Sequence, residues 1–301
     1  MRHTRLIPRI IRSFVEFLSI AALLLPGFLA NAQQLYVPNS DTNWVRDQEP
    51  FRIAGNLYYV GSYDLCSYLI TTPKGHILIN TGIPGSDSMI RRHVEALGFR
   101  FSDIKILLAN HAHFDHVGAM AAVKKATHAR LMIQEMDVPM MADGGNSDFE
   151  FGGHGPMFPP VKVDRSLKDK DVVKLGGMEI LVLHHPGHTK GACSFLFTVK
   201  DSARAWRVLI ANIPSILSET KFPSMPGYPE VSRDYAYTLD TMPKIQFDIW
   251  LSSHAGLFDL QKKHKPGEGY HPEAFIDRAS YDSWLTKLKA QYARKINGQG
   301  Q

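Results

Sequence analysis

Along residues 57–134, the hydrophobic and polar positions alternate between a pattern typical of β-strands and a pattern typical of α-helices. Short runs of aliphatic and aromatic residues, such as LYYVG, CSYLIT and HILIN, are separated by Gly, Asp or Pro-Lys-Gly turns and predict β-strands. The next segment has apolar residues at helical spacing and predicts a helix, with Ser86 placed to cap it and Gly98 to end it. After this helix, IKILLAN predicts a buried strand, GAMAAVKKATH a helix and ARLMIQE another strand.

The second half of the chain repeats this order of elements. VVKLGGMEILVLHHPGH, GACSFLFTV and WRVLIAN predict strands, VSRDYAYTLDTM a helix, FDIWLSSH a strand, and DRASYDSWLTKLKAQYARKI a closing helix. Two β-rich halves, each followed by helices, predict an α/β fold with two packed, mixed β-sheets between flanking helices, which is a four-layer αββα sandwich. Because no linker composition, repeat or low-complexity segment interrupts the pattern, we expect one domain over residues 33–301.

One long segment shows neither pattern. Residues 142–160, ADGGNSDFEFGGHGPMFPP, are rich in Gly, Pro and Phe and have no periodicity. A loop of this length inside a compact chain is usually functional or disordered, and its aromatic residues argue against disorder. We therefore expect this loop to contribute to function.

The first 32 residues have the composition of a secretory signal. Four arginines precede an apolar run from Phe17 to Ala30, and Ala30-Asn31-Ala32 offers the small residues that a signal peptidase reads. The alternative is a membrane anchor, but the run is shorter than the ~20 apolar residues of a spanning helix. We expect cleavage after Ala32, which leaves a periplasmic protein that begins at Gln33.

The formal charge of the chain says little about partners. Of the net charge of +5, the predicted signal accounts for +3, since it has four arginines and Glu16, and +2 remains for the mature protein. No run of Lys or Arg remains of the kind that nucleic-acid binding requires. We expect a monomer that binds neither nucleic acid nor a membrane.

Cys66 and Cys193 are the two cysteines of the chain. In an exported protein they could pair as a disulfide. Each lies in an apolar, strand-like stretch, where a buried thiol behaves as a small hydrophobic side chain. We favour two free thiols, and because neither cysteine has a C-x-x-C partner, a thiolate zinc site is disfavoured.

The segment LLANHAHFDHVGAM places three histidines and an aspartate directly after a predicted strand. Side chains alternate between the two faces of an extended backbone, so His111 and His113 project to the same side and can bind one metal ion. Asp115 and His116 follow where the strand turns toward a helix and can reach a second ion. Neutral imidazole and carboxylate are good zinc ligands, so the cluster predicts zinc chemistry with further ligands from elsewhere in the chain.

Two later histidines are well placed to complete the ligand set. His188 follows a strand on the Pro-Gly turn of HPGHTKG, and His254 ends the strand DIWLSSH. An accidental group of surface histidines is the alternative, but the order of HAHFDH, PGHT and SSH argues against it. The remaining histidines are weaker candidates: His184 and His185 fit supporting or packing roles, His154 fits a substrate contact in the long loop, and we expect surface positions for His76, His93, His128, His264 and His271.

From about Ile53 to the C-terminus, the chain resembles the metallo-β-lactamase superfamily in HAHFDH, PGHTKG and SSHAG. The stretches AGNLYYVGSYDLCSYLI, MADGGNSDFEFGGHGPMF, HHPGHTKGACSFLF and HKPGEGY are similar to subclass B3 enzymes, especially the GOB lineage. That lineage has glutamine at the first motif position, where this chain has His111. The resemblance implies two zinc ions, the first bound by His111, His113 and His188 and the second by Asp115, His116 and His254.

The resemblance also implies a reaction, in which Asp115 is a catalytic residue. Two zinc ions lower the pKa of a shared water, so that a hydroxide forms near neutral pH and attacks the β-lactam amide of penicillins, cephalosporins and carbapenems. Because no Ser-x-x-Lys motif occurs in a suitable setting, we expect hydrolysis without an acyl-enzyme. The resemblance places Ser215 at the substrate carboxylate, although a plain loop serine fits as well, and we expect Met157 and Phe158 to form an apolar wall over the site.

Other functions share HxHxDH. Glyoxalase II-type thioester hydrolases and quorum-quenching lactonases carry an aspartate that bridges both metals, where this chain has Asn212 and Ile213 after VLIA. The missing carboxylate and the predicted export weigh against them, and the missing cysteine in the same segment weighs against other β-lactamase subclasses. A different class of function is also open: the protein could bind metal without catalysing a reaction. A metal site with an exchangeable water usually catalyses a reaction, which argues against this alternative.

Overall fold

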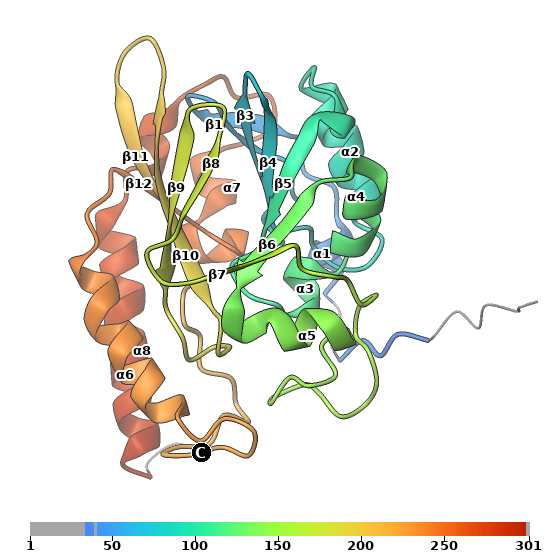
Figure 1. Cartoon of the computed structure of the whole chain (residues 1–301). Helices are drawn as coiled ribbons and strands as arrows, with labels where there is room; N and C mark the ends of the chain where they lie inside the picture. Colours follow the sequence, from blue (N-terminus) through green and yellow to red (C-terminus); the bar gives the residue numbers. More distant parts are fainter. Residues whose placement is uncertain (1–33, 39–40, 299–301) are drawn as a thin grey trace, which may run out of the picture. The chain divides into compact units, whose positions relative to one another are not determined.

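Two mixed β-sheets lie face to face in the computed structural model, which describes residues 34–38 and 41–298 (Figure 1). The first sheet has the strand order β1-β2-β3-β4-β5-β6-β7 and the second β12-β11-β10-β9-β8. Neighbours from β1 to β4 are antiparallel and those from β4 to β7 parallel, whereas in the second sheet β11 and β12 are the parallel pair. The strands are β1 (Phe51–Ala54), β2 (Leu57–Tyr59), β3 (Tyr68–Thr72), β4 (Gly75–Ile79), β5 (Ile104–Leu108), β6 (Arg130–Gln134), β7 (Arg165–Leu167), β8 (Val172–Leu175), β9 (Met178–His184), β10 (Cys193–Lys200), β11 (Ala205–Ala211) and β12 (Ile249–Ser252).

Helices cover the outer face of each sheet (Figure 1). The longer helices α2 and α4 lie beside the first sheet, and α6 and α8 lie beside the second. The predicted four-layer α/β sandwich is therefore confirmed. The α-helices are α1 (Thr42–Val45), α2 (Asp87–Ala96), α3 (Phe114–Val117), α4 (Met120–Thr127), α5 (Val138–Asp143), α6 (Val231–Thr241), α7 (Leu260–Lys263) and α8 (Arg278–Ile296), and short 3₁₀ helices span Phe101–Asp103, Glu135–Asp137, Met242–Lys244, Ala255–Phe258 and Pro272–Phe275.

Successive side chains along the strands of the first sheet point to opposite faces of the sheet and contribute to two main cores. In β4, Ile77 and Ile79 point into the core between the sheets, while Leu78 points into the core under α2 and α4. This is the pattern expected of a sheet that is buried on both faces. The strands are thereby fixed in register, and the parallel strands β4 to β7 all end at the same edge of the first sheet.

Helix α2 begins and ends close to the predicted residues, but its cap differs. Ser86 occupies the N-cap position, yet its side chain makes no capping hydrogen bond because its backbone already has helical angles (φ −69°, ψ −14°). Gly98 ends the helix region with φ 85°, a left-handed conformation that glycine adopts at little cost. The predicted positions of the helix start, Ser86, and of its end, Gly98, are thus correct, but Ser86 does not make the capping hydrogen bond.

Both cysteines are buried and unpaired, as predicted. Three histidines that we expected at the surface are buried instead: His76, His93 and His264. His93 lies on the inner face of α2, where its Nδ1 is 3.0 Å from Val60 O and its Nε2 is 2.7 Å from Asp47 Oδ1. The expectation failed because side chains from other elements pack on the other two rings: Phe51 stacks on His264, and Phe99 lies edge-on to His76.

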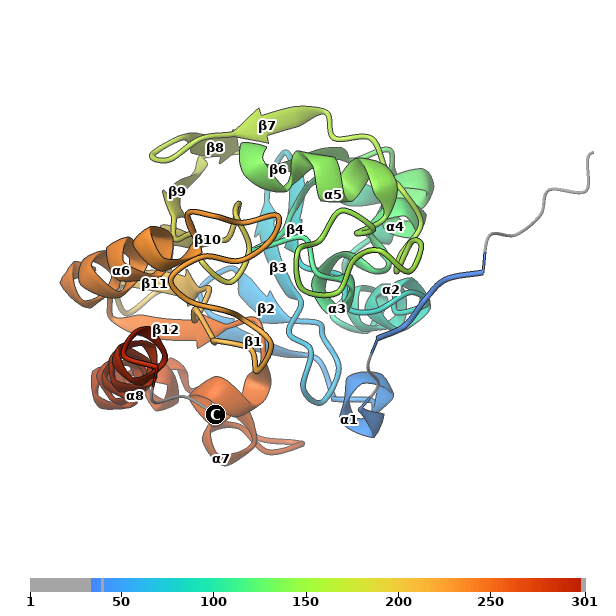
Figure 2. The same ribbon diagram turned by 90° about the horizontal axis from the view of Figure 1, so that it is seen from below.

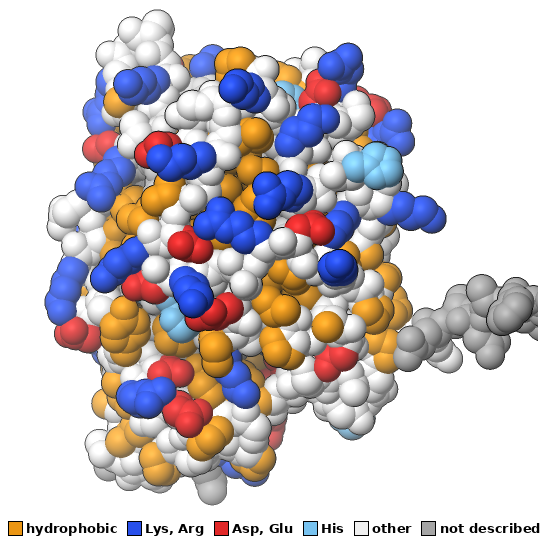
Figure 3. Space-filling model, viewed as in Figure 1, with side chains coloured by type: hydrophobic (Ala, Val, Ile, Leu, Met, Phe, Trp, Pro, Cys, Tyr) orange, Lys and Arg blue, Asp and Glu red, His pale blue; other side chains and the backbone are white. Residues whose placement is uncertain are grey.

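The predicted signal segment, residues 1–32, lies outside the described residues. In the part of the chain that the structure describes, no helix has the length and apolar character needed to cross a membrane. Basic side chains are spread among acidic and apolar ones on the face shown in Figure 3.

Candidate metal centre

The histidine-rich loops meet at the end of the sandwich that faces the viewer in Figure 2. His111 follows β5, His188 lies in the turn between β9 and β10, and His254 follows β12. His113 is the N-cap of α3, whose four residues include Asp115 and His116. The packing of the two sheets therefore brings together ligands that the sequence separates by up to 143 positions, from His111 to His254.

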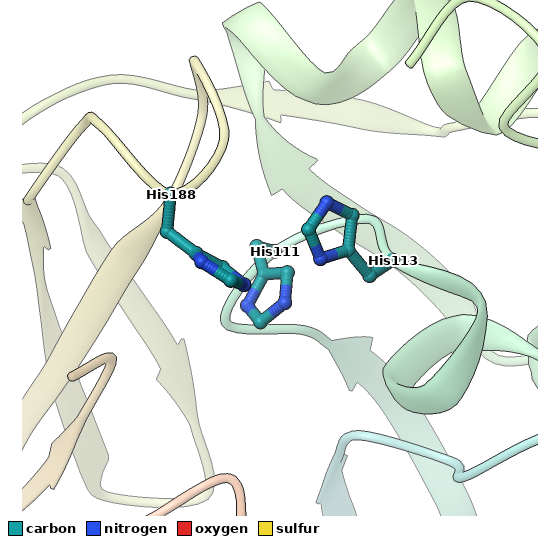
Figure 4. Close-up of side chains that lie close together, drawn as sticks. All are labelled: His111, His113 and His188. Atoms are coloured by element: carbon teal, nitrogen blue, oxygen red, sulfur yellow. The ribbon is translucent and has the colours of Figure 1, made fainter. Parts of the chain in front are cut away.

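His111, His113 and His188 form a compact tripod (Figure 4). One ring nitrogen of each lies within 4.8 Å of the others. Each pair of ring centroids is 4.7 Å apart, and the rings stand at 71–88° to one another. Three imidazoles that converge in this way fit three positions of a tetrahedral zinc site.

The outer nitrogen of each tripod ring is held by an acceptor. His111 Nδ1 is 2.7 Å from Asn212 Oδ1, His188 Nδ1 is 2.9 Å from Ser215 O, and His113 Nε2 is 3.2 Å from Asp148 Oδ2. Because each outer nitrogen must carry the hydrogen that it donates, the other nitrogen keeps a free lone pair. His111 Nε2 is buried without any hydrogen-bond partner, as expected of an atom that binds a metal.

A second group lies beside the tripod and centres on Asp115. Asp115 Oδ2 is 3.3 Å from His116 Nε2 and 3.3 Å from His254 Nε2. Ligand atoms of His111, Asp115 and His116 also lie within 4.8 Å of one another, so the two groups are adjacent. His254 Nδ1 donates to Asp64 Oδ2 at 2.9 Å, the carboxylate–histidine pairing that orients metal-binding rings. The residues present thus fit two zinc ions.

Burial sets the protonation of most of these rings. Burial, helped by the neighbouring histidines, lowers the pKa of His111 well below its ordinary value, that of His116 to about 3 and that of His188 to about 4. These three imidazoles are therefore neutral at neutral pH, which is the state that binds metal.

The charged members of the site depend on each other. Burial alone would raise the pKa of Asp115, but His116 and His254 hold it below its usual range. Burial alone would lower the pKa of His254, but hydrogen bonds to Asp115 and Asp64 raise it. The Asp115 side chain is therefore an ionised carboxylate, ready to accept a cation.

The sequence did not single out Asp137, which joins the two loops of the tripod. Its fully buried carboxylate accepts hydrogen bonds from Ala112 N at 2.9 Å, Thr189 Oγ1 at 2.9 Å and Gly191 N at 2.7 Å. A Cβ at Gly191 would come within 2.6 Å of Asp137, which explains the glycine of HTKG. The only signal in the sequence was an acidic residue shortly after the strand ARLMIQE.

A buried amide pair beneath the metal centre was also missed. Asn80 Nδ2 donates to Asn110 Oδ1 at 3.0 Å, and Asn110 N donates back to Asn80 Oδ1 at 3.0 Å. Asn110 also donates to Cys193 O at 2.9 Å and accepts from Ser253 Oγ at 3.1 Å. These bonds tie the ends of β4, β5 and β12 to the start of β10.

A cavity of about 200 Å³ opens on the metal-binding side chains. Ser215 lines this cavity, as expected of a residue that contacts substrate, and its Oγ lies 3.3 Å from His188 Nδ1. The exposed His154 lies outside it and packs on Tyr36, with ring centroids 4.9 Å apart. Besides the histidines and Asp115, the lining residues are Trp44, Phe114, Phe151, Asn212, Ile213, Ser215, Leu217, Ser252, Ser253 and Leu257.

The expectation that Met157 and Phe158 form the wall of the site is wrong. Both side chains are fully buried in the core under α2 and α4, and neither lines the cavity. Their backbone N–H groups donate to Gly144 O at 2.8 and 3.3 Å, which turns the two residues inward to anchor the loop. Phe151 of the same loop takes the cavity position instead, with its ring 5.2 Å from that of His113.

Comparison with known proteins places this chain among metal-dependent hydrolases. Residues 67–201 match the Metallo-beta-lactamase superfamily. A β-lactamase from Chitinophaga pinensis is 59% identical (TM-score 0.86), and the similarity covers 88% of this chain and 99% of that one. The class B3 di-zinc metallo-β-lactamase LRA-12 from an Alaskan soil metagenome is 53% identical (TM-score 0.85; 87% and 100% covered), and the metallo-β-lactamase GOB-18 from Elizabethkingia meningoseptica is 50% identical (TM-score 0.87; 89% and 99% covered).

Curated relatives are more distant. A hydroxyacylglutathione hydrolase of Rhodopseudomonas palustris is 30% identical over 134 residues, which are 44% of this chain and 44% of that protein. The first curated relative is 27% identical, and the match spans 63% of its length. The chain therefore matches only part of these relatives, whereas it covers nearly all of the three solved structures.

Proposed function

This chain belongs to the metallo-β-lactamase superfamily, and from that premise we propose that it is an exported, zinc-dependent β-lactamase of subclass B3. Its substrates are penicillins, cephalosporins and carbapenems, so it confers resistance to them. The observation that carries the proposal is the buried tripod of His111, His113 and His188 beside Asp115, which lines a cavity with largely apolar walls. The similarity to three β-lactamases over almost their full lengths supports it.

Two groups of side chains would hold the zinc ions. His111, His113 and His188 would hold one ion, and Asp115, His116 and His254 the other. When bound, zinc supplies Lewis-acid chemistry, which polarises the substrate carbonyl and lowers the pKa of water. Asp115 Oδ2 lies 3.3 Å from both His116 Nε2 and His254 Nε2, where the ionised carboxylate can orient a water molecule and pass its proton to the leaving amide nitrogen.

Ser215, which lines the cavity, is not activated as a nucleophile. A serine needs an adjacent base that accepts its proton. His188 Nδ1 faces Ser215, but this nitrogen donates its hydrogen to Ser215 O at 2.9 Å and so cannot accept the proton of Ser215 Oγ. This geometry supports hydrolysis without an acyl-enzyme and leaves the Ser215 hydroxyl free to bind the substrate carboxylate.

The direct test is turnover of the chromogenic cephalosporin nitrocefin by the purified mature protein. We expect hydrolysis that a chelator abolishes and that added zinc restores, with two zinc ions per chain by elemental analysis. Full activity with one zinc or none would refute the two-ion site. Absence of nitrocefin turnover in protein that holds two zinc ions would refute the β-lactamase proposal and leave the metal centre standing.

A thioesterase or lactonase is the second candidate. The similarity to a hydroxyacylglutathione hydrolase favours it. Against it stands Asn212 at the end of β11: its side chain is an amide whose oxygen is engaged by His111 Nδ1, and no carboxylate there can bridge two metals.

A further inference from the structure

The loop of residues 212–230, which we call the rim loop, connects β11 to α6 (Figure 2) and contributes to the lining of the cavity. Ser215 and Leu217 of this loop line the cavity. Beneath the loop lies a small apolar cluster, separate from the two main cores, that contains Ile216 and Tyr235. Ile213 at the start of the loop still packs into the core of the sheets, but from Ile216 onward the loop packs on this separate cluster, so its position there depends on local contacts.

The last turns of α8 supply those contacts. Lys295 Nζ donates to Leu217 O at 3.0 Å, Ser218 O at 2.8 Å and Thr220 O at 3.0 Å. One turn earlier, Gln291 Nε2 donates to Ile216 O at 3.1 Å. Three ammonium hydrogens thus meet three carbonyl oxygens of one short segment.

Three carbonyl oxygens that converge on one point need a cation there. Their dipoles repel one another without a shared donor, and hydrogen bonds to a charged donor are about twice as strong as those between neutral groups. Lysine provides three donors on a single point charge, which a planar guanidinium does not. The side chain therefore fixes the curled conformation of residues 217–220.

We propose that Lys295 is a positioning residue that sets substrate affinity by holding the rim loop in place from α8. This inference rests on the proposed function and adds a determinant outside the metal centre. When Lys295 is removed, Leu217 loses its fixed position and the cavity wall loosens. Ser215 keeps a second anchor, because Tyr235 Oη donates to Ser215 O at 2.9 Å, so His188 keeps its acceptor and the metal ligands stay in place.

The test compares Lys295→Met with Lys289→Met, which removes an exposed lysine from the same helix. The rim loop contains its own trypsin site, the exposed Lys221. Because cleavage of a native protein follows local opening, we expect zinc-loaded K295M to be cut after Lys221 roughly tenfold faster than wild type, and K289M at the wild-type rate. This readout does not depend on β-lactam turnover.

Kinetics complete the test. For nitrocefin and a carbapenem we expect K295M to show a KM raised roughly tenfold, with kcat within twofold of wild type and the same zinc content. Unchanged cleavage after Lys221, or faster cleavage with an unchanged KM, would overturn the proposal. If K295M does not fold, Gln291→Leu, which removes one carbonyl contact, is measured in its place with the same criteria. A wild-type protein without β-lactam turnover refutes the proposed function, while the cleavage rates still decide whether Lys295 holds the loop.

Discussion

Asp137 offers the sharpest test of how the metal centre is assembled. Its carboxylate accepts hydrogen bonds from both loops of the tripod, through Ala112 N on one side and Thr189 Oγ1 and Gly191 N on the other. Asp137→Asn has nearly the same shape, so it changes the hydrogen bonds without creating a cavity. The effect of this change can be worked out atom by atom.

An asparagine can satisfy only part of this arrangement. Oδ2 accepts from Ala112 N and Thr189 Oγ1, and Oδ1 accepts from Gly191 N. Whichever position the amide oxygen takes, its NH₂ group faces a backbone N–H, which is left buried without an acceptor. One such unpaired group costs about 1–3 kcal/mol. Asp137→Ala leaves three donors unpaired and should cost more, about 3 kcal/mol at least.

The assay is urea unfolding of zinc-free protein, which gives the free energy of unfolding without the contribution of bound metal. The control is Asp282→Asn, which loses only an exposed pair with Arg278 and should change the free energy of unfolding by no more than about 0.5 kcal/mol. An Asp137→Asn protein as stable as this control would refute the role of Asp137 as the link between the loops.

Three further predictions concern separate features. His111→Gln should keep appreciable β-lactamase activity, since the GOB lineage that the chain resembles has glutamine there; complete loss in zinc-loaded protein would show that this site requires His111. Burial and the nearby His184 lower the pKa of His185 to about 3. As pH falls below the unfolded value of about 6.5, the unfolded chain binds a proton that the folded protein does not, so the free energy of unfolding decreases. Between pH 6 and 4, the free energy of unfolding of zinc-free His185→Gln should therefore fall less steeply than that of wild type, by about 1.4 kcal/mol per pH unit, and parallel curves would contradict this. Amino-terminal sequencing of periplasmic protein should begin at or next to Gln33, whereas an uncut chain in the membrane fraction would show that Phe17–Ala30 is an anchor.

The layers, and the grouping of the candidate metal ligands, could be predicted from the sequence because both depend on local patterns. Alternation in β4 sends Ile77 and Ile79 to one core and Leu78 to the other, which is visible as a continuous apolar strand. His111 and His113 could be placed because they directly follow such a strand. A motif at the end of a strand can be recognised from the residues beside it in the sequence. The fold then brings several such strand ends together at one site.

The residues that the sequence did not reveal act over long range. Asp137 binds Gly191, which is 54 positions away, and Lys295 binds Leu217, which is 78 positions away. Nothing beside these residues in the chain marks their partners. The prediction that Met157 and Phe158 form the wall of the site was wrong for a related reason. Composition identified the 142–160 loop as aromatic, but the backbone turn at Gly144 determines that Phe151 faces the cavity and Phe158 the core.

The central claim is that this metal centre hydrolyses β-lactam amides in preference to thioesters and lactones. The most direct measurement compares kcat/KM of one zinc-loaded preparation for a carbapenem, for S-lactoylglutathione and for an acyl-homoserine lactone. We predict efficient hydrolysis of the carbapenem, its loss with a chelator, and little activity on the other two substrates, because Asn212 provides no bridging carboxylate. A kcat/KM for the thioester or the lactone that equals or exceeds the value for the carbapenem would contradict the β-lactamase assignment.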